Sequence, residues 1–304
     1  MNRKDILGIR DLSKDELIEI LDTAKEMKRI IMGEKYSEIL KGKTVVTIFF
    51  EPSTRTRLSF EMAVKYLGAH FGNIEISSSS IVKGESLIDT VRTVEMMKAD
   101  VIVIRHNMSG TPHFVAKYLN ASVINAGDGI NEHPTQALLD MMTIREKKLH
   151  FEGLKVAIIG DIIHSRVARS NLWGLKKLGA EVRFAGPSTL LSEDFNKLGA
   201  KVYYNVDEAI KDADVVMGLR IQLERQKSGL FPSIDEYAKY FGINSERMKL
   251  AKPDAILMHP GPVNRNVELT SEIANAGYSV IEKQVTNGVA VRMALLKLLC
   301  ERSE

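Results

Sequence analysis

The sequence is poor in cysteine and in long hydrophobic runs, and each shortage excludes a class of protein. The single cysteine, Cys300, rules out an internal disulfide and a cysteine-rich zinc cluster, and it fits a reducing compartment. No stretch approaches the ~18 uninterrupted apolar residues that a membrane-spanning helix needs. The charged N-terminal segment also lacks the apolar core of a secretory signal. We therefore expect a cytoplasmic protein that has no membrane partner.

No charge of one sign dominates the sequence. It has 42 lysine and arginine residues against 39 aspartate and glutamate residues, which gives a formal net charge of +3. This near balance argues against a surface that binds nucleic acid, but it leaves room for a local basic pocket. With 304 residues, the chain is long enough for two domains of roughly 150 residues, each with a core of its own.

Apolar runs alternate with helical stretches along the whole chain. A capping box of Ser13 and Glu16 begins the first helix, whose apolar spacing continues to the region of Met27. Near-continuous apolar strands interleaved with helices indicate parallel strands that are covered on both faces. The expected strands are 44–50, 100–106, 155–161, 181–186, 201–204, 214–218 and 255–262. A final helix is expected over about 288–301.

The alternation restarts at Lys155, which indicates a second unit of the same type. We predict an α/β fold of two doubly wound parallel-sheet domains, with the C-terminal helix packing back on the first domain. The first domain is expected to comprise 1–134 and 287–304, and the second 135–286.

The segment from Phe50 to Arg57, FEPSTRTR, is the strongest candidate for a binding site. An apolar strand runs directly into alternating hydroxyl and guanidinium side chains that open a helix. Unpaired backbone N–H groups at a helix N-terminus attract anions, and an arginine such as Arg55 can bind a phosphate through two hydrogen bonds. The segment lacks the glycines and the GK pair of a Walker loop. The alternative is an ordinary helix cap followed by surface arginines.

Further polar side chains follow other predicted strands. His133 and Gln136, in the segment HPTQ, belong to a turn before a helix, and Arg105 ends a buried strand. Ligands of open α/β sheets bind at the carboxyl ends of the strands, where these side chains would lie. No second histidine or carboxylate stands at metal-ligand spacing, so we expect no metal. A structural histidine and a solvated arginine are the alternatives.

Three more candidate segments are polar loops or strand ends. Lys83 is the one strong cation of the loop 77–86, which composition alone describes as a surface loop. Arg166 follows a strand that lacks the full GxGxxG of a dinucleotide site. Arg220 and Gln222 stand two residues apart on one side of an extended chain, and two planar donors at this spacing suit a carboxylate. A salt-bridged strand end is the alternative.

With these motifs in this order, the sequence resembles the transcarbamoylase family over essentially its whole length. The matching segments are FEPSTRTR, KGES, IRH, HPTQALLD, GD followed by Arg166, LRIQLER and HPGP. STRTR and HPTQ are typical of the carbamoyl phosphate half that the branches of the family share, whereas LRIQLER and HPGPVNR are typical of the aspartate branch. The ornithine branch is expected to carry a cysteine where Pro260 stands. Gly261 replaces the leucine of some aspartate-branch members, so only a backbone contact is carried over there.

The resemblance implies a reaction and a role for each candidate residue. A carbamoyl group would pass from carbamoyl phosphate to the amine of L-aspartate, in pyrimidine (UMP) biosynthesis, without a cofactor. The expected catalytic residues are Arg55, Thr56, Arg105 and His133. The expected carbamoyl phosphate ligands are Ser53, Thr54, Arg55, Thr56, Arg105, His133, Gln136 and the backbone of Pro260 and Gly261. The expected aspartate ligands are Lys83, Arg166, Arg220 and Gln222.

The resemblance also implies partners. In the family, residues that match Ser79 and Lys83 reach into the site of a neighbouring subunit, so a homotrimer with shared active sites is expected. A regulatory chain is an additional candidate partner. Three alternatives stay open: a different acceptor such as ornithine or an acylated ornithine, a non-catalytic subunit that binds a phosphometabolite, and a dinucleotide dehydrogenase. The last rests on analogy of fold alone.

Overall fold

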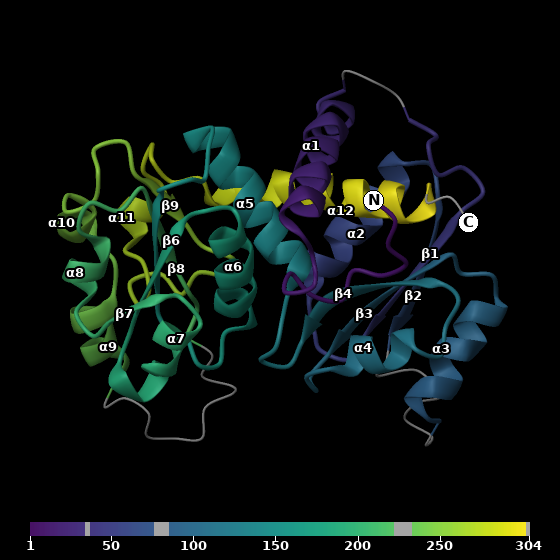
Figure 1. Ribbon diagram of the computed structural model, residues 1–304, viewed down its shortest axis with the longest axis horizontal. Helices are drawn as coiled ribbons and strands as arrows, with labels where there is room; N and C mark the ends of the chain where they lie inside the picture. Colours follow the sequence, from purple (N-terminus) through teal and green to yellow (C-terminus); the bar gives the residue numbers. More distant parts are fainter. Residues whose placement is uncertain (34–36, 76–84, 222–232, 302–304) are drawn as a thin grey trace. The chain divides into compact units, whose positions relative to one another are not determined.

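The computed structural model describes residues 1–33, 37–75, 85–221 and 233–301 (Figure 1). The chain forms two compact units, Met1–Met142 with Thr286–Glu304, and Thr143–Val285. The two crossings between the units fall inside helices α5 (Pro134–Lys148) and α12 (Ile281–Cys300). Each unit holds one wholly parallel sheet with helices packed on it. The predicted α/β class, with the C-terminal helix returning to the first domain, is therefore confirmed.

The first unit is built on four parallel strands in the order β2-β1-β3-β4. These are β1 (Thr44–Phe49), β2 (His70–Glu75), β3 (Val101–His106) and β4 (Ser122–Asp128). Helices α3 (Leu87–Met96) and α4 (Thr111–Ala116) bury their apolar residues against Ile48, Ile102 and Ile104. Figure 1 shows α2 (Thr54–Tyr66) and α12 on the opposite face of this sheet. Helices thus cover both faces, which explains why β1 and β3 are apolar on both sides.

The N-terminal segment adds to this unit in two ways. Ile6 makes a parallel bridge to Ile124, which places the segment alongside β4. The helix α1 (Lys14–Ile31) then begins with the predicted capping box, in which the Ser13 hydroxyl accepts from the Glu16 backbone N–H at 3.1 Å and the Glu16 carboxylate accepts from the Ser13 N–H at 2.8 Å. Satisfying these end groups fixes the start of α1.

The second unit is built on five parallel strands in the order β7-β6-β5-β8-β9. The strands are β5 (Lys155–Ile159), β6 (Glu181–Ala185), β7 (Lys201–Tyr203), β8 (Val215–Gly218) and β9 (Ile256–Met258). The described helices are α6 (Arg166–Lys177), α7 (Asp194–Lys197), α8 (Val206–Ile210), α9 (Ile234–Phe241), α10 (Ser245–Met248) and α11 (Ser271–Ala274). Residues of α8 and α10 pack against Ala157, Val216 and Leu257, and Figure 1 shows α6 on the other side of the sheet. In the part of the chain that the structure describes, no helix combines the length and apolarity needed to cross a membrane.

Each sheet has one point where the strand order reverses, and this point decides where side chains can bind a ligand. In the first unit the chain leaves β1 toward β2 and returns to the other side of β1 as β3. In the second unit the chain leaves β5 toward β6 and returns to the other side of β5 as β8. The loops that follow such a pair diverge to opposite faces and leave a crevice at the carboxyl ends of the strands.

All seven expected strands are present, but two further strands and one helix boundary were not predicted correctly. β2 is an edge strand, HFGNIE, without an apolar run. β4 is fully buried although it contains Asn125 and Asp128, because these polar groups bond to one another. The last helix starts at Ile281, so Gly288 lies inside α12 and not at its beginning.

Candidate active site

The first turn of α2 carries the FEPSTRTR segment at the carboxyl end of β1. Ser53 is the residue that precedes the helix, and its side chain makes no capping hydrogen bond to the helix backbone. No acidic residue lies in the first turn. Thr54 and Arg55 are exposed, and Thr56 is half-buried. Hydroxyls, a guanidinium and the positive end of a helix dipole therefore gather where an anion can reach them.

Arg105 stands beside this turn, because β3 is the neighbour of β1. Arg105 is the register partner of Phe49 in that pairing. Its Nε lies 3.3 Å from Glu51 Oε2, and its Nη1 donates a hydrogen bond to the Ala126 carbonyl at 3.3 Å. Only 13% of the Arg105 side chain and 15% of the Glu51 side chain are exposed. The arginine is thus held at the same sheet edge as the first turn of α2.

His133 and Gln136 open α5 after β4, which is the neighbour of β3. Both side chains are buried, and the Gln136 backbone N–H donates to the His133 carbonyl at 3.0 Å. The Gln136 side-chain amide donates to Asp140 Oδ1 at 2.9 Å, which leaves its carbonyl oxygen pointing away from that bond. The first unit therefore brings its three predicted groups to the ends of three adjacent strands, β1, β3 and β4.

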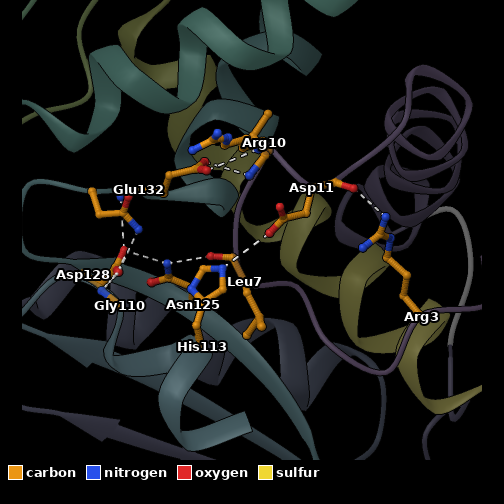
Figure 2. A network of polar contacts seen from close by, with 11 residues as sticks. Arg3, Leu7, Arg10, Asp11, Gly110, His113, Asn125, Asp128 and Glu132 are labelled. Atoms are coloured by element: carbon orange, nitrogen blue, oxygen red, sulfur yellow. Dashed lines mark hydrogen bonds and ion pairs between the residues drawn. The ribbon is translucent and has the colours of Figure 1, made fainter. Parts of the chain in front are cut away.

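A network of backbone and carboxylate contacts fixes the turn in front of His133 (Figure 2). Asp128 accepts hydrogen bonds from the Glu132 N–H at 3.1 Å and from the Gly110 N–H at 2.7 Å. The buried Glu132 carboxylate accepts from the backbone N–H groups of Ile9 at 2.7 Å and Arg10 at 3.2 Å. The N-terminal segment thereby holds the residue adjacent to His133.

No sequence pattern indicated Glu132, although it lies directly before His133. A buried carboxylate that binds a distant backbone leaves no periodic pattern. Only the structure gives a reason for Gly8, because a Cβ there would come within 2.5 Å of Glu132 Oε1.

His106 follows Arg105 at the end of β3, and its surroundings change its pKa. Its ring lies 4.6 Å from the Phe50 ring, centroid to centroid, and its Nδ1 accepts from the Met108 N–H at 2.9 Å. Burial lowers the pKa of His106, and the carboxylates of Glu51 and Asp128 oppose this shift. The neutral imidazole is therefore favoured at the end of β3.

In the second unit, too, predicted site residues follow the carboxyl ends of neighbouring strands. Arg166 is buried and begins α6 after β5, where the Ser165 hydroxyl caps the helix by accepting from the Ala168 N–H at 3.1 Å. Arg220 is half-buried and follows β8, the neighbour of β5. The two arginines therefore stand at the strand-order reversal of the second sheet.

Pro260 and Gly261 follow β9 and continue the same sheet edge. Gly261 has φ +65°, a left-handed conformation that glycine adopts without strain, and its N–H donates to His259 Nδ1 at 2.8 Å. A leucine here would be strained by this backbone conformation, which gives a physical reason for the glycine in HPGP.

No sequence pattern indicated Glu268 either, although its carboxylate connects two segments at this sheet edge. Its buried carboxylate accepts from the Ile221 N–H at 3.0 Å, next to Arg220, and from the Asn264 N–H at 2.7 Å. Burial raises the pKa of Glu268, although these hydrogen bonds oppose the shift. One side chain thus ties the chain after β8 to the chain after β9.

The remaining predicted site residues, Ser79, Lys83 and Gln222, lie outside the described residues. Within the described ranges, no three His, Cys, Asp or Glu side chains gather in a way that could hold a metal ion.

Comparison with known proteins also divides the chain into two parts, with the C-terminal helix assigned to the second part. Residues 4–146 match the aspartate/ornithine carbamoyltransferase family through its carbamoyl-P binding domain, and residues 152–299 match the Asp/Orn binding domain of that family. The chain is 78% identical over 302 residues to the aspartate carbamoyltransferase catalytic subunit of Caldanaerobacter subterraneus subsp. tengcongensis, and the match covers 99% of both chains.

Two solved structures share this fold at full length. The ornithine carbamoyltransferase of Pyrococcus furiosus has a TM-score of 0.88 at 32% identity, over 99% of this chain and 98% of the other. The aspartate transcarbamoylase of Trypanosoma cruzi in complex with N-(phosphonacetyl)-L-aspartic acid has a TM-score of 0.88 at 31% identity, over 97% and 95%. The chain therefore belongs to the aspartate/ornithine carbamoyltransferase family.

Proposed function

We propose that this chain transfers the carbamoyl group of carbamoyl phosphate to the amine of L-aspartate, giving N-carbamoyl-L-aspartate and phosphate, a step of pyrimidine biosynthesis. The observation that carries the proposal is the convergence of Ser53 to Arg57, Arg105 and His133 at three adjacent strand ends. The 78% identity to an aspartate carbamoyltransferase catalytic subunit supports aspartate as the acceptor.

In this proposal the first unit binds carbamoyl phosphate. The phosphate takes hydrogen bonds from the first turn of α2 and from Arg55 and Arg105. Thr56, Arg105 and His133 donate to the carbamoyl oxygen, and Gln136 binds the carbamoyl NH2. Fixed donors of this kind stabilise the negative charge that develops on the oxygen.

Arg166, Arg220 and Gln222 are proposed to bind the two carboxylates of aspartate. The amine attacks the carbamoyl carbon, a C–N bond forms, and the tetrahedral intermediate collapses as the C–O bond to phosphate breaks. The departing phosphate accepts the proton that the amine loses. The rate is gained by positioning two anionic substrates and by stabilising the oxyanion.

The test is turnover of carbamoyl phosphate with L-aspartate, beside L-ornithine and beside Arg55→Ala. We expect carbamoylation of aspartate alone, with a loss of at least about 100-fold in Arg55→Ala because a charge-assisted phosphate contact is removed. Turnover with ornithine would contradict the assignment of Arg220. Absence of turnover with both amines would instead favour a non-catalytic binding subunit.

Ser79 and Lys83 are proposed to complete the site of a neighbouring subunit in a homotrimer. If the sites are shared, a mixture of Arg55→Ala and Lys83→Gln subunits contains some sites with neither substitution. Unfolding and refolding the two inactive variants together should then restore part of the activity. No recovery, with trimers present, would contradict shared sites.

A further inference from the structure

Arg292 of α12 lies buried in the first unit and is not among the residues assigned to the substrates. Only 3% of its surface is exposed. Its Nη1 donates a hydrogen bond to the Ser59 hydroxyl at 2.9 Å, and its Nη2 donates one to the Thr135 hydroxyl at 3.3 Å. Ser59 belongs to α2 and Thr135 to α5, so one guanidinium joins these two helices.

Both hydroxyls are close to residues of the carbamoyl phosphate site. Ser59 follows Arg55 by one helical turn, so the two side chains lie on the same face of α2. Thr135 stands between His133 and Gln136 in the turn that opens α5. A guanidinium presents its donors in a rigid planar fork. The two hydrogen bonds therefore set how far apart the first turns of α2 and α5 lie.

The surroundings of Arg292 are shaped to hold a guanidinium. A Cβ on Gly288, one turn earlier in α12, would lie 2.6 Å from Nη1. Glycine inside a helix is less favourable than alanine by roughly 0.5–1 kcal/mol, so a glycine in α12 calls for a packing reason. The guanidinium carbon also lies 5.1 Å from the centre of the Phe60 ring, within range of a cation–π contact.

The charge of Arg292 makes a role in packing alone a poor explanation. Within the described residues, its hydrogen bonds go to hydroxyls and not to a carboxylate, and its Nε has no hydrogen-bond partner. Burial lowers the pKa of Arg292 to about 10, which leaves it protonated at neutral pH. A buried cation without a counter-ion is costly, and an apolar side chain of similar volume would often give a more stable core.

We propose that Arg292 is a positioning residue that fixes the first turn of α2 relative to the first turn of α5, and so sets the separation of Arg55 and His133. The inference rests on the proposed function, because it concerns the same carbamoyl phosphate site. Arg292 acts through Ser59 and Thr135 and touches no substrate. A misplacement of about 1 Å in an oriented site can lower a rate by about 100-fold.

The test compares kcat and both KM values for Arg292→Lys, Arg292→Gln, Ser59→Ala and Thr135→Ala. Lysine keeps the charge but cannot present two parallel donors, so we expect kcat to fall by about 10-fold to 100-fold in both Arg292 variants. The KM for aspartate should stay within about twofold, because Arg166 and Arg220, two of the proposed aspartate ligands, lie on the second unit. A lysine variant with wild-type kcat would overturn the proposal.

The hydroxyl variants keep the test valid if the Arg292 variants fold poorly. Each removes one small group, and each should lower kcat by about threefold to tenfold through loss of one hydrogen bond to a charged donor. Combining Thr135→Ala with Ser59→Ala should lower kcat no further than Arg292→Gln does. Wild-type kcat in the doubly substituted protein would overturn the proposal.

Arg183 offers a matched control in the second unit. It is also buried, its Nη1 donates to the Ala209 and Lys211 carbonyls, and its guanidinium lies 5.9 Å from the Tyr203 ring centre. Arg183→Gln should lower thermal stability while the folded protein keeps its kcat. An equal loss of kcat in Arg183→Gln and Arg292→Gln would overturn the proposal, because general destabilisation would then explain both.

Hydrogen exchange in the protein without substrate separates this inference from the proposed function. Amides in the first turns of α2 and α5 should exchange at least about threefold faster in Arg292→Gln than in the wild type. In Arg183→Gln the same amides should exchange at the wild-type rate. Unchanged exchange in Arg292→Gln would overturn the positioning role of Arg292, whatever the activity. If exchange is faster in Arg292→Gln and the wild type carbamoylates no amine, the positioning role of Arg292 is supported and only the proposed function is overturned.

Discussion

Arg105 and Glu51 form an ion pair at the carboxyl ends of two neighbouring strands, with 3.3 Å between Arg105 Nε and Glu51 Oε2. Both side chains are mostly buried, so the carboxylate partly cancels the charge that a phosphate would meet. The pair also orients Arg105, but the contact is long for an N–H···O hydrogen bond. We infer that the effect of charge is larger than the effect of orientation.

Glu51→Gln should therefore strengthen the binding of inorganic phosphate. The substitution keeps an acceptor of the same shape and removes one negative charge, which is expected to lower Kd by about fivefold, or about 1 kcal/mol. Isothermal titration of the wild type and the variant measures this, with Arg105→Ala as the opposite control. Weaker binding in Glu51→Gln would show that orienting Arg105 matters more than its net charge.

Glu268→Ala should weaken aspartate use selectively. The substitution leaves the buried N–H of Ile221 and the half-buried N–H of Asn264 without their acceptor, and loss of the acceptor of a buried N–H costs about 1–3 kcal/mol. The chain beside Arg220 then loses its anchor, and we expect the KM for aspartate to rise by about 10-fold to 100-fold. The KM for carbamoyl phosphate should stay within about twofold.

Steady-state kinetics with each substrate varied in turn measures the effect of Glu268→Ala. Glu272→Ala, at an exposed carboxylate of α11, is the matched control and should keep wild-type constants. Equal changes in both KM values would argue that Glu268 supports the fold and not the aspartate ligands in particular.

Gly8→Ala should destabilise the turn in front of His133. A Cβ at Gly8 would lie 2.5 Å from Glu132 Oε1, so the carboxylate has to move away from the Ile9 N–H. We expect a loss of about 1–3 kcal/mol in the free energy of unfolding, as for other overpacked sites, and a lower kcat through displacement of His133.

Urea unfolding and kcat test this substitution against Gly277→Ala. A Cβ at Gly277 meets nothing within 4 Å, and its substitution should change stability by no more than about 1 kcal/mol. Similar effects of the two substitutions would show that the contact between Gly8 and Glu132 is not what makes Gly8→Ala harmful.

The stability of the first unit should fall in acid partly through His106. Burial lowers the pKa of this imidazole below its ordinary value of 6.5, although Glu51 and Asp128 oppose the shift. A group whose pKa is lowered by folding contributes stability above its unfolded pKa, and that contribution is lost as pH falls through the folded pKa. Stability should therefore decrease as pH falls from about 7 toward 5.

His106→Gln should show a smaller decrease over the same pH range. Urea unfolding at several pH values measures the difference, and His150→Gln, at an exposed histidine, is the control. An identical pH dependence in His106→Gln and the wild type would contradict a role for burial of this imidazole.

Local sequence patterns predicted the parts of this protein that depend on neighbouring residues. Apolar runs of strand length located seven strands, because a parallel strand covered on both faces must be apolar throughout. The capping box located the start of α1, since Ser13 and Glu16 each bond to the other's backbone within one turn. FEPSTRTR indicated an anion site because hydroxyls and guanidiniums at a helix start have a direct chemical meaning.

The sequence by itself thus determined the fold class, seven of the strands and the candidate residues, whereas only the tertiary structure decided which groups hold them in place. Strand order put the ends of β1, β3 and β4 side by side. Glu132, Glu268 and Arg292 act on partners far away in the chain, at Ile9, Ile221 and Ser59. Such contacts leave no local pattern, because their geometry exists only after the elements have packed.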